Sequence, residues 1–145
     1  MPRNATILKL FDAAFWILIA GALLDAGVLS LLADDTNNRL ITPLLIALPI
    51  LGGLAAVVRI MDGIVERRML ARAFAAWRAN SALGPTVSGE VLAELADFNP
   101  DQAWHARQWL LEKGKHEGVR PEVKPHADAP LSVAANRWEF RFPRS

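Results

Sequence analysis

Two long apolar runs, separated by a short polar tract, constrain this chain more than any other feature of its sequence. The runs cover residues 13–33 and 40–58, and the tract between them covers residues 34–39. A helix needs about 20 apolar residues to cross the ~30 Å hydrocarbon core of a bilayer, which is close to the length of each run. The sequence therefore predicts a transmembrane hairpin, with helices at 13–33 and 40–60 and an external turn at 34–39.

Composition agrees with this prediction and limits what else the chain can be. Hydrophobic residues make up 52% of the 145 residues, and the formal net charge is only +1. A net charge this small creates no overall field that attracts nucleic acid or acidic partners. The chain has no cysteine, which excludes disulfides, thiolate metal ligands and cysteine catalysis. Arginine outnumbers lysine and alanine is abundant, a composition typical of a bacterial gene.

The positive charges beside the apolar runs predict the orientation of the hairpin. Arg3 and Lys9 precede the first run, and Arg39 lies in the turn. Arginines follow the second run at positions 59, 67, 68, 72 and 78. Short cytoplasmic flanks of membrane helices carry the excess of lysine and arginine. We therefore expect a multi-pass protein of the bacterial inner membrane, with residues 1–12 and the chain after residue 60 in the cytoplasm.

Two other interpretations of the apolar runs are weaker. A cleaved signal peptide over residues 1–33 would have an apolar run longer than the usual ~7–15 residues, and Leu31 stands where the cleavage site needs a small residue. A soluble helical protein of this size would have to bury two helices that are apolar on nearly all sides. The membrane hairpin accounts for the sequence better than either.

Two residues inside the runs, Asp25 and Pro49, are irregular for a simple membrane anchor. Asp25 lies twelve residues into the first run, ~18 Å along a helix, where an ionised carboxylate costs at least ~2.5–3.5 kcal/mol. Three interpretations stay open for it: a contact with the second helix near Thr42, a hydrogen bond between subunits of an oligomer, or a proton or ion relay. Pro49 removes a backbone hydrogen bond and is expected to kink the second helix.

A basic amphipathic helix is expected at 61–80, directly after the second run. Residues 64–79 contain no glycine or proline, and their apolar side chains fall on one face, with arginines on the flanks and back. This helix either lies in the membrane interface, with its arginines on anionic lipid, or packs its apolar face on the rest of the chain. The residues expected to contact lipid or a partner are Arg67, Arg68, Arg72, Phe74, Trp77 and Arg78.

Residues 81–145 form the predicted cytoplasmic module, which begins with two helices. Ser88 is typical of a helix N-cap and predicts a helix over 89–97. The sequence Asn-Pro-Asp-Gln from Asn99 predicts the start of a second helix, because it combines a cap, a proline at the first position and a glutamine that reaches back. We expect this helix to run to Lys113 and to stop at Gly114.

This helix pair, over residues 91–118, resembles a helix-turn-helix, and the tail after it resembles a winged helix in outline, with 119–124 paired to 137–142. The resemblance implies DNA binding, with His105, Arg107 and Gln108 as the residues that read bases. The second helix instead begins with Pro100 and Asp101, and an acid there repels phosphate. We therefore expect the helix to contact protein rather than DNA, through Trp104, His105, Arg107 and Gln108.

Sequence motifs of catalysis are missing. His105, His116 and His126 lack the spacing of metal ligands, and the chain has no glycine-rich phosphate loop, nucleophile elbow or paired-carboxylate motif. We expect no enzymatic activity, no cofactor and no metal site.

The sequence therefore predicts a mainly α-helical membrane protein: a transmembrane hairpin, an amphipathic helix and a helix-turn-helix-like module with a short C-terminal β element. The expected role is to anchor or scaffold a membrane-associated protein assembly. Its partners would be membrane lipid and proteins, including a second copy of the chain. Two alternatives remain: a membrane-tethered, winged-helix-like DNA-binding protein, and a pore-forming or channel-forming oligomer built around Asp25.

Overall fold

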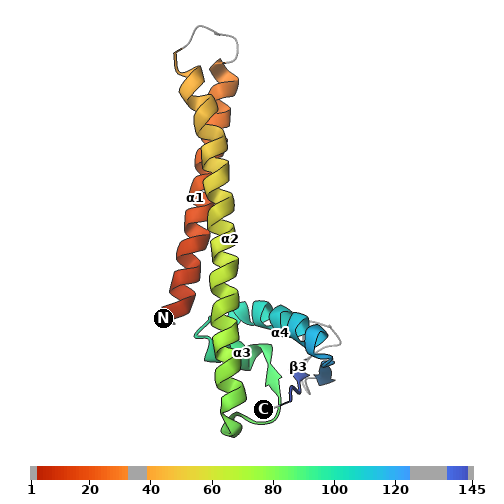
Figure 1. The fold of residues 1–145 in the computed structure, drawn as a ribbon. Coiled ribbons are helices and arrows are strands. Elements are labelled where there is room, and N and C mark those ends of the chain that lie inside the picture. The colour runs from red at the N-terminus through yellow and green to blue at the C-terminus, as the bar shows by residue number, and fades with distance from the viewer. Residues whose placement is uncertain (1–2, 33–38, 125–136, 144–145) are drawn as a thin grey trace. The chain divides into compact units, whose positions relative to one another are not determined.

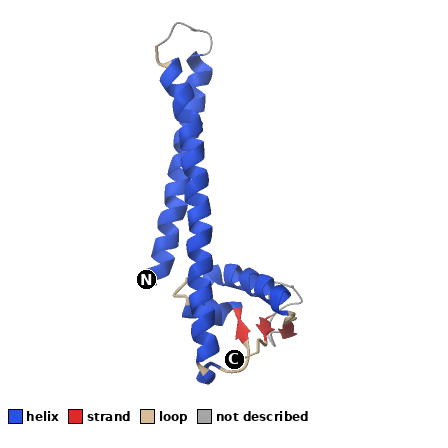
Figure 2. Ribbon diagram, in the orientation of Figure 1, coloured by secondary structure: helices blue, strands red, loops and turns tan. Residues whose placement is uncertain are grey.

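The computed structural model describes residues 3–32, 39–124 and 137–143. The chain divides into two compact units. The hairpin unit is Thr6–Val65, and the α/β unit combines Met1–Ala5 with Glu66–Ser145. Helix is the dominant structure in both units, and strands occur only in short segments (Figure 2).

Two long helices form the hairpin unit. Helix α1 covers Arg3–Leu32 and helix α2 covers Ile41–Ala79, and the two run side by side over this unit (Figure 1). The Arg59 guanidinium lies over the ring of Phe15, 5.7 Å from its centroid. The predicted hairpin of apolar helices is confirmed, although α1 already begins at Arg3, within the N-terminal flank predicted at 1–12. Of the turn predicted at 34–39, all but Arg39 lies outside the described residues.

Most apolar side chains of the hairpin unit face outward. The most apolar 18-residue stretch has a mean hydropathy of 2.1 in α1 and 2.3 in α2, and only 6% of each stretch is buried. Leu31, for example, is 84% exposed. A water-soluble protein rarely exposes apolar surface on this scale. Two long apolar helices that are largely exposed indicate insertion into a membrane.

Helix α2 continues without interruption from the hairpin unit into the α/β unit. The helix predicted over 64–79 is therefore confirmed as the second half of α2 rather than a separate helix. Pro49 lies inside α2, which continues through it.

The α/β unit adds two helices and a small sheet to this end of α2. Its elements after α2 are the 3₁₀ turn Ser81–Leu83, β1 (Val87–Ser88), α3 (Gly89–Leu95), the 3₁₀ turn Pro100–Gln102, α4 (Ala103–Glu117), β2 (Glu122–Lys124) and β3 (Arg137–Phe140). The strands form an antiparallel sheet in the order β1-β3-β2. Val123 pairs with Trp138, which confirms the predicted strand pairing, and Val87 pairs with Phe140 in a contact that sequence reasoning missed.

Both predicted helix starts are confirmed by their caps. The Val91 N–H donates to the Ser88 hydroxyl oxygen at 3.3 Å, and the Asn99 N–H donates to the Gln102 side-chain oxygen at 3.0 Å. These bonds satisfy backbone donors that a helix start leaves open. Helix α3 ends at Leu95, two residues earlier than expected.

The predicted end of α4 at Gly114 is wrong. Helix α4 runs to Glu117 and ends at Gly118, whose φ of 71° is left-handed. Gly114 stays inside the helix, and its carbonyl accepts the N–H groups of both Gly118 and Val119. Glycine is required at position 114 for a packing reason, because a Cβ there would lie 2.7 Å from the Val119 carbonyl oxygen.

The core of the α/β unit lies between α2, α4 and the sheet. Phe74 of α2 packs edge-on against Trp109 of α4 and Phe142 after β3, with ring centroids 5.4 and 4.9 Å apart. Trp77 of α2 and Phe140 of β3 are fully buried. A side chain buried in this way contributes about 1.5–3 kcal/mol. Of the two interpretations of the basic helix, the structure therefore shows the one in which its apolar face packs on the rest of the module.

Candidate functional site

Four of the predicted site residues come together in a groove between α2 and α4. Trp104, His105 and Gln108 lie on α4 and face Arg67 of α2 across this groove. Its volume is about 270 Å³. We call it the Trp104 groove, and its lining is Glu66, Arg67, Leu70, Trp104, His105, Gln108, Trp109 and Glu112.

Two side-chain pairs cross the Trp104 groove. The His105 Nδ1 lies 3.1 Å from a Glu66 carboxylate oxygen, and Arg67 lies 3.5 Å from a Glu112 oxygen. Both pairs are partly exposed, so each contributes at most about 1 kcal/mol to stability. Their main effect is that Arg67 and Glu112 offset each other's charge and that the His105 ring contacts a Glu66 carboxylate oxygen.

Trp104 is the most conspicuous side chain of this groove. It is 58% exposed, whereas Leu70 in the same lining is fully buried. A large aromatic that is exposed on a rigid helix, next to arginine, is typical of the residues that dominate protein–protein binding energy. Trp104, His105 and Gln108, which the sequence names as candidate contact residues, lie together on the side of α4 that lines this groove.

Arg107 does not belong to this groove. Its guanidinium lies 3.4 Å from a carboxylate oxygen of Glu90 and so connects α4 to α3. Partial burial favours the protonated form of Glu90, but hydrogen bonds from its own backbone N–H and the Ser88 hydroxyl, with the Arg107 charge, outweigh burial and hold its pKa below the ordinary value. This ionised pair is a structural link between the helices.

The remaining predicted contact residues of α2 have different environments. Phe74 and Trp77 are in the core, and the Arg78 guanidinium lies 2.8 Å from a Glu117 oxygen and over the Phe74 ring. Burial opposes ionisation of Glu117, but hydrogen bonds from Lys113 and Arg78 lower its pKa. Two arginines remain on the exposed face of α2, Arg68 and Arg72.

Arg72 borders a second groove, which sequence reasoning missed. This Arg72 groove has a volume of about 240 Å³ and is lined by Asn4, Met69, Arg72, Ala73, Ala76, Leu95 and Ala96. The Asn4 side-chain amide donates to the Ala96 carbonyl oxygen at 2.7 Å, and the Ala5 N–H donates to the Asp97 carbonyl oxygen at 3.3 Å. Asn4 and Ala96 are 92 residues apart in the sequence, so no local sequence signal predicts the hydrogen bond between them.

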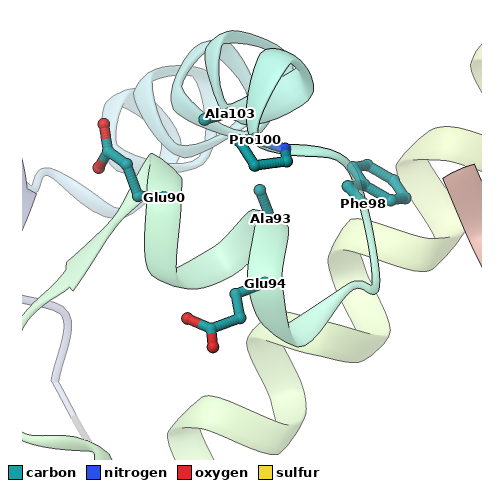
Figure 3. Close-up of a pocket in the computed structure, with 6 residues that line it drawn as sticks. All are labelled: Glu90, Ala93, Glu94, Phe98, Pro100 and Ala103. Carbon is teal, nitrogen blue, oxygen red and sulfur yellow. The ribbon is translucent and has the colours of Figure 1, made fainter. Parts of the chain in front are cut away.

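A third hollow, of about 380 Å³, lies beside the joint between α3 and α4. Figure 3 shows Ala93 of α3 facing Pro100, with Phe98 beside them and the carboxylates of Glu90 and Glu94 pointing away from Phe98. Because Glu90 is already paired with Arg107, this pocket offers an apolar surface and one exposed carboxylate, without a nucleophile or a base in position.

Asp25 lies inside the hairpin unit and is only 7% exposed. Neither carboxylate oxygen has a hydrogen-bond partner among the residues that the structure describes, so no bond to Thr42 is present. The side chain is therefore largely enclosed by its own hairpin.

Within the described ranges, no three histidine, cysteine or acidic residues gather as metal ligands, and His126 lies outside those ranges. Comparison of the chain with protein-family models, with curated proteins and with solved structures found no match.

Proposed function

We propose that this chain is a small adaptor of the bacterial inner membrane, which holds a partner protein at the cytoplasmic surface by means of the Trp104 groove. The exposed Trp104 beside a groove whose two glutamates each contact a side chain of the groove is the observation that carries this proposal. The hairpin supplies the membrane anchor and the α/β unit supplies the binding surface.

The composition of the α/β unit supports a topology in which both ends of the hairpin lie on one side. This unit combines Asn4 and Ala5, which precede the first span, with residues that follow the second span, and hydrogen bonds join them. Segments that pack together in this way share one side of a membrane. The basic residues near both ends favour the cytoplasmic side. Cleavage after residue 33 would remove Asn4, so this contact also argues against a signal peptide.

The Trp104 groove fits an apolar helix face of a partner better than a charged ligand. Its floor is Leu70 and Trp109, and its glutamates are paired with His105 and Arg67. A partner helix that lays its apolar side into such a groove buries Trp104 against the apolar residues of the lining.

Site-specific photo-crosslinking of the full-length protein in native membranes tests this proposal. A photo-reactive amino acid at Gln108, inside the groove, should capture a discrete partner protein, and the same probe at Lys115 on the exposed end of α4 should not. Trp104→Ala should abolish the adduct while Lys115→Ala preserves it. Equal labelling from both positions, or an adduct that survives Trp104→Ala, would contradict the proposal.

DNA binding is a second candidate, because the element order α2, β1, α3, α4, β2, β3 and the strand order β1-β3-β2 resemble a winged helix. The side chains of α4 disfavour it. Of the residues expected to read bases, His105 is paired with Glu66 and Arg107 with Glu90. Salt-dependent binding of duplex DNA by the detergent-solubilised full chain would support this candidate, and no binding at low salt would remove it.

A further inference from the structure

We propose that the α/β unit carries a second docking surface, formed by the Arg72 groove together with Arg68, and that its occupant is an acidic amphipathic helix of a partner protein. This surface shares no residue with the Trp104 groove, so the inference stands independently of the proposed function.

The first argument is the charge that Arg68 and Arg72 leave uncompensated. Arg59, Arg67, Arg78 and Arg107 each lie within 3.5 Å of a carboxylate oxygen. In the part of the chain that the structure describes, neither Arg68 nor Arg72 has such a partner, and both are exposed. Because no carboxylate of the described residues offsets these two neighbouring guanidiniums, this face of α2 has a local positive charge.

The second argument is the spacing of these two arginines. Residues four apart on a helix lie one above the other, with Cβ atoms about 5–6 Å apart. A partner helix that runs alongside α2 presents its own side chains at the same interval. Carboxylates at positions i and i+4 of that helix therefore meet Arg68 and Arg72 together, and each guanidinium can bind its carboxylate through two hydrogen bonds.

The third argument is the apolar surface beside the arginines. Met69, Ala73 and Ala76 of α2 and Leu95 of α3 line the Arg72 groove, and Leu95 is 37% exposed. Alanine side chains are small, so the axis of an approaching helix can come close to α2. An occupant with leucine-like residues next to its carboxylates would cover the apolar residues and the arginines at once.

Anionic lipid headgroups carry the same charge as an acidic helix, but a helix that crosses the membrane along its normal would place these arginines beyond the headgroups. The apolar run of α2 ends at Val58, and Arg68 and Arg72 follow ten and fourteen residues later in the same helix. At 1.5 Å per residue they lie about 15 and 21 Å beyond the hydrocarbon along the helix. The headgroup layer on each side is only about 5–8 Å thick. The distance favours a protein ligand.

The test uses the full-length protein in nanodiscs of zwitterionic lipid. The probe is a fluorescent helical peptide of about 18 residues that carries glutamates at i, i+4 spacing and leucines on the adjoining face. Its binding is followed by anisotropy, with empty nanodiscs as background and a peptide with glutamine in place of glutamate as the control. Saturable binding of the glutamate peptide only, weakened by added salt, is the expected result.

The variants locate the binding. The double variant Arg68→Gln, Arg72→Gln should lower the affinity for the peptide at least about tenfold, because charge-assisted hydrogen bonds to its glutamates are lost. The matched control is Arg78→Gln with Arg107→Gln, which changes net charge by the same amount but removes arginines that are already paired with carboxylates and that line neither groove. It should leave the affinity within about twofold. Ala76→Glu keeps both arginines, adds a carboxylate to the groove and should also weaken binding.

Three results would overturn the proposal. The first is the absence of saturable binding by the wild-type chain. The second is an equal loss of affinity in the two double variants, which would show attraction to net charge alone. The third is displacement of the peptide when phosphatidylglycerol replaces part of the zwitterionic lipid, which would assign the arginines to a lipid headgroup. A urea unfolding curve of each variant shows whether it is fully folded under the binding conditions, so that a loss of affinity is not mistaken for unfolding.

Discussion

Replacement of Gly89 by alanine should destabilise the α/β unit by opening the contact between α3 and α4. Gly89 is the first residue of α3 and is buried against the start of α4. A Cβ at this position would lie 2.8 Å from the Ala103 carbonyl oxygen and 3.1 Å from the Arg107 backbone nitrogen. Both atoms belong to the backbone of α4 and cannot rotate away, so the helix itself must shift.

The size of the effect follows from these distances. Ordinary contacts of a Cβ begin at 3.4 Å, so α4 must retreat by about 0.6 Å from α3. This retreat loosens the fully buried Leu92 and Leu110, which lie on the two helices. Overpacking of a core by one methyl group typically costs about 1–3 kcal/mol. We expect Gly89→Ala to lower the free energy of unfolding of the α/β unit by about 2 kcal/mol, near the centre of that range.

Urea unfolding of the full-length protein in detergent micelles, followed by tryptophan fluorescence, measures this loss. With an m value of about 2 kcal/mol/M, a loss of about 2 kcal/mol lowers the midpoint by about 1 M. Gly63→Ala is the matched control, because nothing lies within 4 Å of its Cβ and alanine favours a helix interior over glycine. Its midpoint should not fall.

A midpoint for Gly89→Ala within about 0.2 M of wild type, which corresponds to less than about 0.5 kcal/mol, would refute the reasoning. An equal fall for Gly63→Ala would also refute it, because the loss would then not depend on the contact with α4.

Three further predictions concern other contacts. Asn4→Ala removes the hydrogen bond to the Ala96 carbonyl and should cost about 1 kcal/mol of α/β-unit stability, seen as a lower urea midpoint and faster hydrogen exchange after α3. Because the pKa of Glu117 is lowered in the folded state, its pairing with Arg78 stabilises the unit above pH 4.5 and is lost as the pH falls further. Arg78→Gln should lose roughly 0.2–1 kcal/mol at pH 7 and show a weaker acid dependence of the urea midpoint. Asp25→Leu should make membrane insertion of the first span more favourable by about 3 kcal/mol in a translocation assay, and an unchanged insertion efficiency would contradict the assignment of this helix as a membrane span.

The sequence predicts the features of this fold that depend on nearby residues. The caps at Ser88 and Asn99 are local hydrogen bonds, so the residue types are sufficient to place the helix starts. The end of α4 is different. Gly114 and Gly118 both satisfy the rule that glycine follows a helix, and only the approach of the Val119 backbone decides between them. That approach is a tertiary contact, which spacing along the chain does not contain.

The candidate site shows the same limit. Trp104, His105 and Gln108 were predictable because helical periodicity places them on one side of α4. Their neighbours across the groove, Glu66 and Arg67, come from another helix, and the sequence gives no register between the two. The Arg72 groove was missed because its lining includes residues that are far apart in the sequence. Asn4 and Ala96, for example, are separated by 92 residues.

The hydrogen bond between Asn4 and Ala96 has a consequence for biosynthesis. The α/β unit is discontinuous in the chain, because Thr6–Val65 is inserted between its first residues and the rest. During synthesis, Asn4 emerges from the ribosome long before its partner, which follows 92 residues later. The two ends of the segment between them must be brought back together. In the proposed topology, insertion of the hairpin would do this by returning the chain to its starting side, so that the bilayer would lower the entropic cost of closing the loop before the α/β unit folds.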